Sequence, residues 1–215
     1  MMRLYTYFRS SAVFRVRIAL NLKGLSYEAV PVHLLRDGGQ QHAPEFAQRN
    51  PSHLVPVLDD DGRTITQSLA IIEYLDEQYP TPTLLPKGPE QRAKVRALAF
   101  DIACDIHPLN NLRVMQYLTT DLAVDEDKRN AWSRHWIAVG FTAIERKLRE
   151  IGSEGDYCFG NSATLADCCL VPQVFNAIRL KCPLDDVPTI QSIYEQCMKL
   201  PAFERAAPSN QPDAE

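Results

Sequence analysis

Two adjacent serines, Ser10 and Ser11, stand between a short apolar segment and a stretch of residues with helical spacing. The N-terminus of a helix carries unpaired backbone N–H groups and the positive end of the helix dipole, so it favours an anion. One interpretation is that a serine hydroxyl only caps the helix. The other is that the hydroxyls and the helix end hold a ligand thiolate or carboxylate. Lowering the pKa of a thiol by one unit from ~8.5 requires about 1.4 kcal/mol of preferential stabilisation of the thiolate.

Two further segments could bind an extended, charged ligand. Proline removes a donor from a strand, so Val55-Pro56 indicates either an edge strand with a trans bond or a cis bond that turns the Val55 backbone outward. The trans form is favoured by its frequency. Gln67 and Ser68 begin a predicted helix, where Ser68 either caps the helix or holds a carboxylate.

The elements that must position these residues form an α/β pattern within residues 1–80. A short β-α-β crossover implies parallel pairing, and Asp-Gly between two apolar runs is a hairpin signal that implies antiparallel pairing. We expect strands at residues 4–7, 27–32, 55–58 and 63–66, and helices at 12–23 and 67–78.

After residue 80 the pattern becomes helical. A proline cluster predicts a linker at 81–89, and the helical domain then spans 90–215. Thr164 and Asp167 resemble a capping box. Pro208–Glu215 is polar and is predicted to be a loose tail. The expected helices cover residues 89–119 with a bend at Pro108, 125–150, a stretch from 164, and 190–198.

The composition excludes several classes of protein. A net charge of −4 over 215 residues, with a pI near 5.8, argues against nucleic-acid binding. The sequence contains no apolar run long enough for a membrane span and no signal peptide, so we expect a cytoplasmic protein. Six cysteines without C-x-x-C spacing predict neither a disulfide framework nor a zinc site, and the histidines lack metal-ligand spacing.

Motifs along nearly the whole chain resemble the zeta class of glutathione transferases, and within it the maleylacetoacetate isomerases. This resemblance implies a thioredoxin-like domain with a mixed four-stranded sheet, an all-α domain and a homodimer. The segments that carry it are Tyr7–Leu20, Asn50–Pro51 with Val55–Pro56, Gln67–Leu75, Asp105–Leu112, Thr164–Asp167, Leu170–Val174 and Gln211–Asp213.

The resemblance also implies a role for each matching residue, with glutathione as the cofactor. Ser10 and Ser11 would lie at the glutathione sulfur, with Ser10 as the first choice for stabilising the thiolate. The backbone of Val55, before a cis Pro56, would pair with the cysteinyl part. The remaining binding residues would be Gln41 at the glycyl end, Gln67 and Ser68 at the γ-glutamyl carboxylate, and His107 and Asn111 closing the site. Arg9, Arg113 and Arg179 would bind the substrate, and Arg9 would also be catalytic.

The implied reaction converts maleylacetoacetate to fumarylacetoacetate in tyrosine and phenylalanine catabolism. The thiolate adds to the cis double bond of this diacid, the resulting single bond rotates, and the thiolate leaves. Ala12 stands where eukaryotic members carry cysteine, so no protein thiol acts there. Three alternatives remain: a maleylpyruvate isomerase, a transferase acting on small electrophiles or α-haloacids, and a binding module without turnover. A disulfide oxidoreductase is disfavoured because no cysteine begins the first helix.

Overall fold

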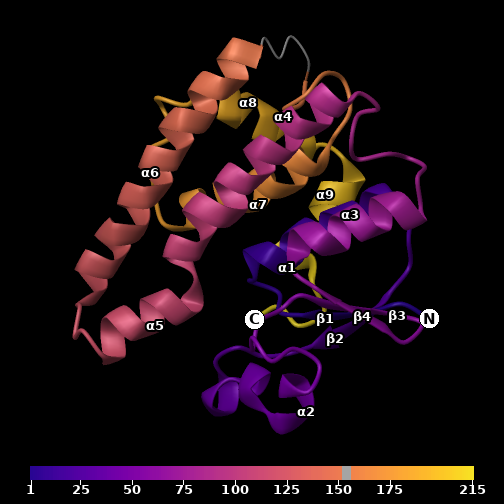
Figure 1. Ribbon diagram of the computed structural model, residues 1–215. Helices are drawn as coiled ribbons and strands as arrows, with labels where there is room; N and C mark the ends of the chain where they lie inside the picture. The colour runs from indigo at the N-terminus through magenta and orange to yellow at the C-terminus, as the bar shows by residue number, and fades with distance from the viewer. Residues whose placement is uncertain (152–155) are drawn as a thin grey trace. The chain divides into compact units, whose positions relative to one another are not determined.

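The computed structural model describes residues 1–151 and 156–215, and these form two compact units (Figure 1). The first unit consists of Met1–Leu84 together with Met198–Glu215, and the second is Leu85–Cys197. The division falls within the segment expected to be a linker. The C-terminal boundary differs from the sequence analysis, because the last segment packs with the first unit and not with the helical one.

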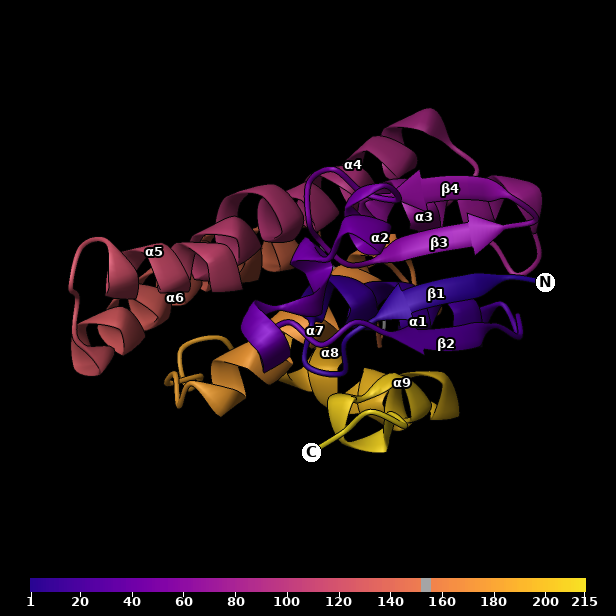
Figure 2. The same cartoon turned by 90° about the horizontal axis from the view of Figure 1, so that it is seen from below.

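A mixed four-stranded sheet forms the centre of the first unit, in the order β2-β1-β3-β4 (Figure 2). β1 pairs with β2 in parallel, as the short crossover predicts, and β3 pairs antiparallel with both β1 and β4. The strands are β1 Arg3–Thr6, β2 Glu28–Pro31, β3 Val57–Asp60 and β4 Arg63–Thr66. The predicted mixed sheet and the predicted hairpin are therefore confirmed.

Helices cover both faces of this sheet (Figure 1). Strand side chains alternate between the faces, so Leu4 is fully buried on the side of α1 and α3, whereas Tyr5 packs edge-to-face on Phe46 of α2. α9 packs along α1. The helices of this unit are α1 Ser11–Leu22, α2 Pro44–Ala47, α3 Ser68–Gln78 and α9 Pro201–Ala206.

The C-terminal tail is ordered, so the prediction of a loose tail is wrong. After α9, Pro208–Asn210 forms a 3-10 turn, and the side-chain amide of Gln211 donates to the backbone carbonyls of Arg205 and Ala207 at 2.8 and 2.9 Å. The polar side chains that suggested solvation instead bond to the backbone of their own segment. This is a local alternative that composition does not reveal.

The second unit contains helices and no strand among its described residues. The helix expected over 89–119 is interrupted: α4 ends at Phe100, and a π-helical turn at Asp101–Ile106 and a 3-10 turn at His107–Asn110 precede α5. Pro108 lacks the N–H that a continuous helix needs. No helix in the described part of the chain is long and apolar enough to span a membrane. The α-helices are α4 Pro89–Phe100, α5 Leu112–Thr120, α6 Glu126–Ile151, α7 Leu165–Arg179 and α8 Pro188–Met198.

Candidate functional site

The N-terminus of α1 follows a tight turn and is capped by Ser10. Ser10 has an extended backbone, and its Oγ accepts a hydrogen bond from the N–H of Val13 at 3.3 Å. Both Ser10 and Ser11 are partly exposed, and the first turn of α1 contains no acidic residue. The cap is therefore real, but it leaves the Ser10 hydroxyl proton and the helix dipole available to an anion.

The peptide bond between Val55 and Pro56 is cis, as the family resemblance implies. The general preference of bonds before proline would have favoured trans. Asn50 holds the preceding loop, because its Nδ2 donates to the carbonyl of Leu54 at 2.8 Å and its Oδ1 accepts from the N–H of Ser52 at 3.1 Å. Within the described residues, no hydrogen bond uses the backbone N–H or C=O of Val55. These two groups can therefore pair with an extended ligand.

The N-terminus of α3 is built differently from that of α1. Gln67 lies at φ +71°, a left-handed conformation that costs a non-glycine residue about 1–3 kcal/mol and that concentrates at functional sites. The side chain of Gln67 does not cap the helix, and the first turn contains no acidic residue. Ser68 begins α3 and is 5% exposed. This helix end too is open to a carboxylate from outside the protein.

Arg15 connects these two helix ends, and sequence reasoning did not single it out. It lies in α1, is 2% exposed, and its Nη1 donates to Ser68 Oγ at 3.1 Å. A buried guanidinium so close to Ser68 adds positive charge where the α3 dipole is already positive. The detectable signal was an arginine between apolar residues that α1 buries, Phe14 and Val16.

Gln41 contributes an unsatisfied buried oxygen. Its side chain is 5% exposed, and its Nε2 donates to the carbonyl of Leu34 at 3.4 Å. Its Oε1 is buried, and no hydrogen-bond partner for it exists among the described residues. An unpaired buried acceptor is costly unless a ligand satisfies it, so this oxygen could accept an amide N–H from a bound peptide.

Arg9 and the four remaining predicted residues are placed as follows. Arg9 is exposed in the turn before α1, within the first unit. His107 and Asn111 share a segment of the second unit, where Asn111 caps α5 by accepting from the Arg113 N–H at 3.1 Å. The Asn111 amide lies 3.5 Å from His107 Nε2. Arg179, the last residue of α7, is exposed and donates to Asn176 Oδ1 at 2.7 Å.

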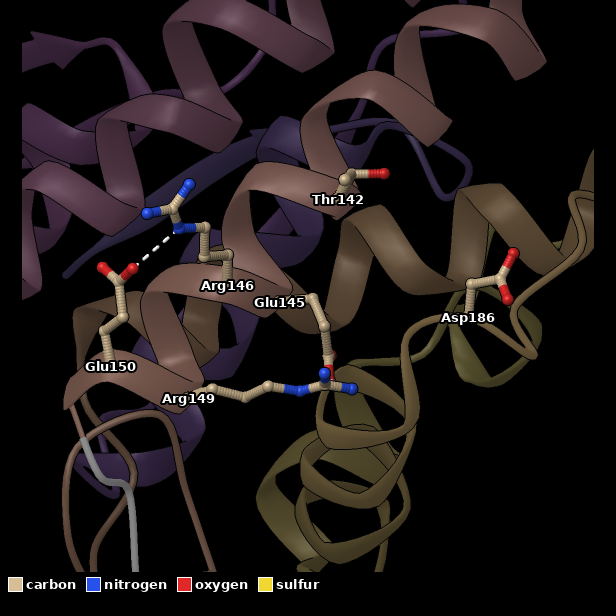
Figure 3. A pocket seen from close by; sticks show the side chains of 6 residues that line it. All are labelled: Thr142, Glu145, Arg146, Arg149, Glu150 and Asp186. Atoms are coloured by element: carbon tan, nitrogen blue, oxygen red, sulfur yellow. Dashed lines mark hydrogen bonds and ion pairs between the residues drawn. The ribbon is translucent and has the colours of Figure 1, made fainter.

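A charged hollow beside α6 contains none of the predicted site residues (Figure 3). The carboxylate of Glu145 accepts the N–H groups of Thr189 and Ile190 at the start of α8, at 3.1 and 3.0 Å. Burial acts to raise the pKa of Glu145, but these hydrogen bonds and the charge of Arg149 hold it below its ordinary value. The hollow therefore surrounds a helix cap. Its lining is Thr142, Glu145, Arg146, Arg149, Glu150 and Asp186.

The cysteines offer no activated protein thiol in the first unit, because all six lie between residues 104 and 197. Burial raises the pKa of Cys158, Cys168 and Cys197 above the ordinary value, so these groups remain protonated at neutral pH. A thiolate at the N-terminus of α1 would therefore have to come from a ligand.

Comparisons with known proteins agree with this geometry. Residues 4–83 match the family described as glutathione S-transferase, N-terminal domain. A protein of Vibrio cholerae serotype O1 named "Probable maleylacetoacetate isomerase" is 56% identical, over 98% of this chain and 97% of that protein.

Two solved structures resemble the whole chain. One is a holo structure of a maleylpyruvate isomerase, described as a bacterial glutathione S-transferase of the zeta class. It is 47% identical with a TM-score of 0.96, over 99% of this chain and 100% of the other. The second is the maleylacetoacetate isomerase of Anaeromyxobacter dehalogenans with glutathione bound in its active site. It is 42% identical with a TM-score of 0.88, over 100% of this chain and 98% of the other. From the identity, the coverage and the shared fold, this chain belongs to the glutathione transferase family and, within it, to the zeta class.

Proposed function

We propose that this protein is a glutathione-dependent cis–trans isomerase that converts maleylacetoacetate to fumarylacetoacetate. The observation that carries the proposal is the contact between Arg15 and Ser68, which joins two helix N-termini that contain no acidic residue of their own. Two positive helix ends beside a buried guanidinium suit a ligand with several negative groups. Glutathione, with a carboxylate at each end and an ionisable thiol, is such a ligand.

The donors and acceptors of the first unit fit glutathione in chemical type. Ser10, with Ser11 beside it, would hold the sulfur, and Gln67 and Ser68 would hold the γ-glutamyl carboxylate. The Val55 backbone before Pro56 would pair with the cysteinyl part, and Gln41 would accept an N–H near the glycyl end. When bound, glutathione supplies the nucleophilic thiolate that the reaction needs.

Arginines would bind the substrate, which is a diacid. A guanidinium matches a carboxylate with two parallel hydrogen bonds, and it also stabilises negative charge that develops on a ketone oxygen. Arg9 is assigned this second, catalytic task because it directly precedes Ser10. Arg113 and Arg179 of the second unit would hold carboxylates, and His107 and Asn111 would close the site.

Ser10 has a defined chemical task in this reaction. Its Oγ accepts from the Val13 N–H, and this bond leaves its own O–H proton available to donate to a sulfur. Such a donation, together with the helix dipole, favours the ionised sulfur at neutral pH. We further propose that the enzyme is a cytoplasmic homodimer.

A maleylpyruvate isomerase is the second candidate, because a zeta-class enzyme of that name has a TM-score of 0.96 to this chain. Its substrate is a shorter diacid with the same reactive double bond. The ratio of kcat/KM for the two substrates separates these candidates. A transferase acting on small electrophiles or α-haloacids would instead accumulate stable thioether products, which mass spectrometry detects.

The decisive experiment follows the loss of maleylacetoacetate by absorbance, with and without glutathione. We expect turnover to require glutathione and Ser10→Ala to lower kcat at least about tenfold, equivalent to about 1.4 kcal/mol of transition-state stabilisation. Thr164→Ala is the matched control, since it removes a hydroxyl that caps α7 in the other unit. Full activity of Ser10→Ala would refute the assignment of Ser10, and turnover without glutathione would refute the proposed function.

A further inference from the structure

Two charged side chains hold the turn that leads into α1. The backbone N–H of Phe8 donates to Asp213 Oδ2 at 2.9 Å, and the carbonyl of Phe8 accepts from Arg17 Nη2 at 3.0 Å. Phe8 and Arg9 are the central residues of this turn, which a backbone hydrogen bond from the N–H of Ser10 closes at 3.0 Å. The peptide groups on both sides of Phe8 are therefore fixed from outside the turn.

Arg17, which holds the carbonyl of Phe8, is itself held by several hydrogen bonds. It is 1% exposed, and its Nε donates to the carbonyl of Ala206 at the end of α9 at 2.9 Å. Its Nη1 donates to Thr6 Oγ1 at 3.3 Å. Burial lowers the pKa of Arg17 to about 10, which leaves the guanidinium charged at neutral pH, and the charge of Asp213 acts in the opposite direction. Strand β1, the turn and α9 thus meet at one buried cation.

Asp213, which accepts from the N–H of Phe8, belongs to a tail that makes further contacts with the protein. The carboxylate of Glu215 pairs with Arg36 and lies 3.3 Å from His33 Nε2. Gln211 bonds to the backbone after α9, as described above. The tail is therefore held independently of Phe8, and it brings Asp213 to a turn that lies 205 residues earlier in the sequence.

We propose that Asp213 is a positioning residue for the isomerase reaction, because it fixes the Phe8 backbone and so sets the placement of Ser10 and Arg9. The inference rests on the proposed function, which assigns those two residues their tasks. Asp213 itself touches neither substrate nor cofactor in this role. A turn free to shift by about 1 Å can reduce a reaction rate by up to about a hundredfold, since catalytic groups then miss their geometry.

The test compares four variants of the full-length protein. Asp213→Ala leaves the Phe8 N–H without its acceptor, and we expect hydrogen exchange at this amide to rise at least about tenfold in the glutathione-free protein. We expect glutathione-dependent kcat to fall about tenfold, with less than about a twofold change in KM. Asp213→Asn keeps an acceptor oxygen of the same shape and should stay within about threefold of the wild type. Glu215→Gln is the control for loosening the tail, and it should change neither quantity.

Should Asp213→Ala fail to fold, Asp213→Glu takes its place, because it displaces the carboxylate by one methylene. Relative to Asp213→Asn, it must then show the faster exchange at the Phe8 amide and the lower kcat. If Asp213→Ala or Asp213→Glu keeps the hydrogen-exchange rate and the kcat of the wild type, the proposal is overturned. Equal losses in Glu215→Gln would also overturn it, because they would indicate general anchoring of the tail. If the wild type neither binds glutathione nor isomerises the substrate, the proposed function fails, whereas the exchange data still report whether Asp213 fixes the turn.

Discussion

Two helix N-termini of the second unit, those of α7 and α8, are completed in the opposite way to two of the first unit, those of α1 and α3. At α7 and α8 the protein supplies its own anion: Asp167 completes the capping box of α7, and Glu145 accepts two N–H groups at the start of α8. In the first unit α1 and α3 begin without an acidic residue. A hydroxyl at a helix start is common to Ser10 and Thr164, so the hydroxyl does not distinguish a site from a cap. The difference is whether the negative charge comes from the chain or must come from a ligand.

The α7 cap shows how completely an internal anion can satisfy a helix end. Asp167 is fully buried and accepts from the N–H of Cys158 at 2.9 Å and from the N–H and Oγ1 of Thr164 at 2.7 and 2.8 Å. Burial raises its pKa, and these hydrogen bonds oppose the shift. The Thr164 Oγ1 in turn accepts from the N–H of Ala166 at 3.3 Å, so side chains of this chain cap the start of α7 from both sides. Its role is structural stability.

The largest expected effect is at this closed end. Asp167→Ala leaves the buried donors of Cys158 and Thr164 without an acceptor, so we expect the free energy of unfolding to fall by about 3 kcal/mol. Urea denaturation followed by circular dichroism measures this change, and Asp185→Ala, at an exposed position, is the control. A loss below about 1 kcal/mol would mean that the cap is not a main source of stability.

The second effect comes from closing an open end. Ala12→Asp places an acidic residue in the first turn of α1, where it should stabilise the glutathione-free protein by about 0.5 kcal/mol. The same charge competes with a bound thiolate, so we expect glutathione-dependent turnover to fall about tenfold, equivalent to about 1.4 kcal/mol. Ala12→Asn is the near-isosteric control without the charge. Equal turnover in the two variants would show that charge at this helix end does not matter to the reaction.

The smallest effect concerns the α8 cap and its dependence on pH. The pKa of Glu145 in the folded protein lies below its ordinary value of 4.5, so its stabilising contribution is present above pH 4.5 and is lost as the pH falls through the folded pKa. Glu145→Gln retains a carbonyl acceptor but does not titrate. We expect this variant to lower the free energy of unfolding by about 1 kcal/mol at neutral pH. The difference from the wild type should shrink under acidic conditions. Urea denaturation measures this difference, and a difference that stays constant from neutral to acidic pH would contradict the role of the Glu145 carboxylate in capping α8.

Local sequence patterns predicted the sheet because their signals are short-range. The parallel and antiparallel pairings follow from crossover length and from the Asp-Gly turn, and Thr164 with Asp167 marked the start of α7. The break at Pro108 was predicted, because proline lacks the N–H of a continuous helix, but the π-helical turn that begins after Phe100 was not. The ordered tail was missed because its polar side chains find backbone partners that only the folded chain supplies.

By itself, the sequence indicated the order of the four strands and of α1 and α3, the serines at the two helix starts, Ser10 and Ser68, and the class of protein that these motifs resemble. Tertiary structure alone decided that Arg15 reaches Ser68 and that Asp213 reaches Phe8. The physical reason is separation along the chain: these contacts join residues 53 and 205 positions apart. Periodicity and capping rules extend over a few residues, whereas packing of α1 and the tail in one unit brings such distant groups within hydrogen-bond distance.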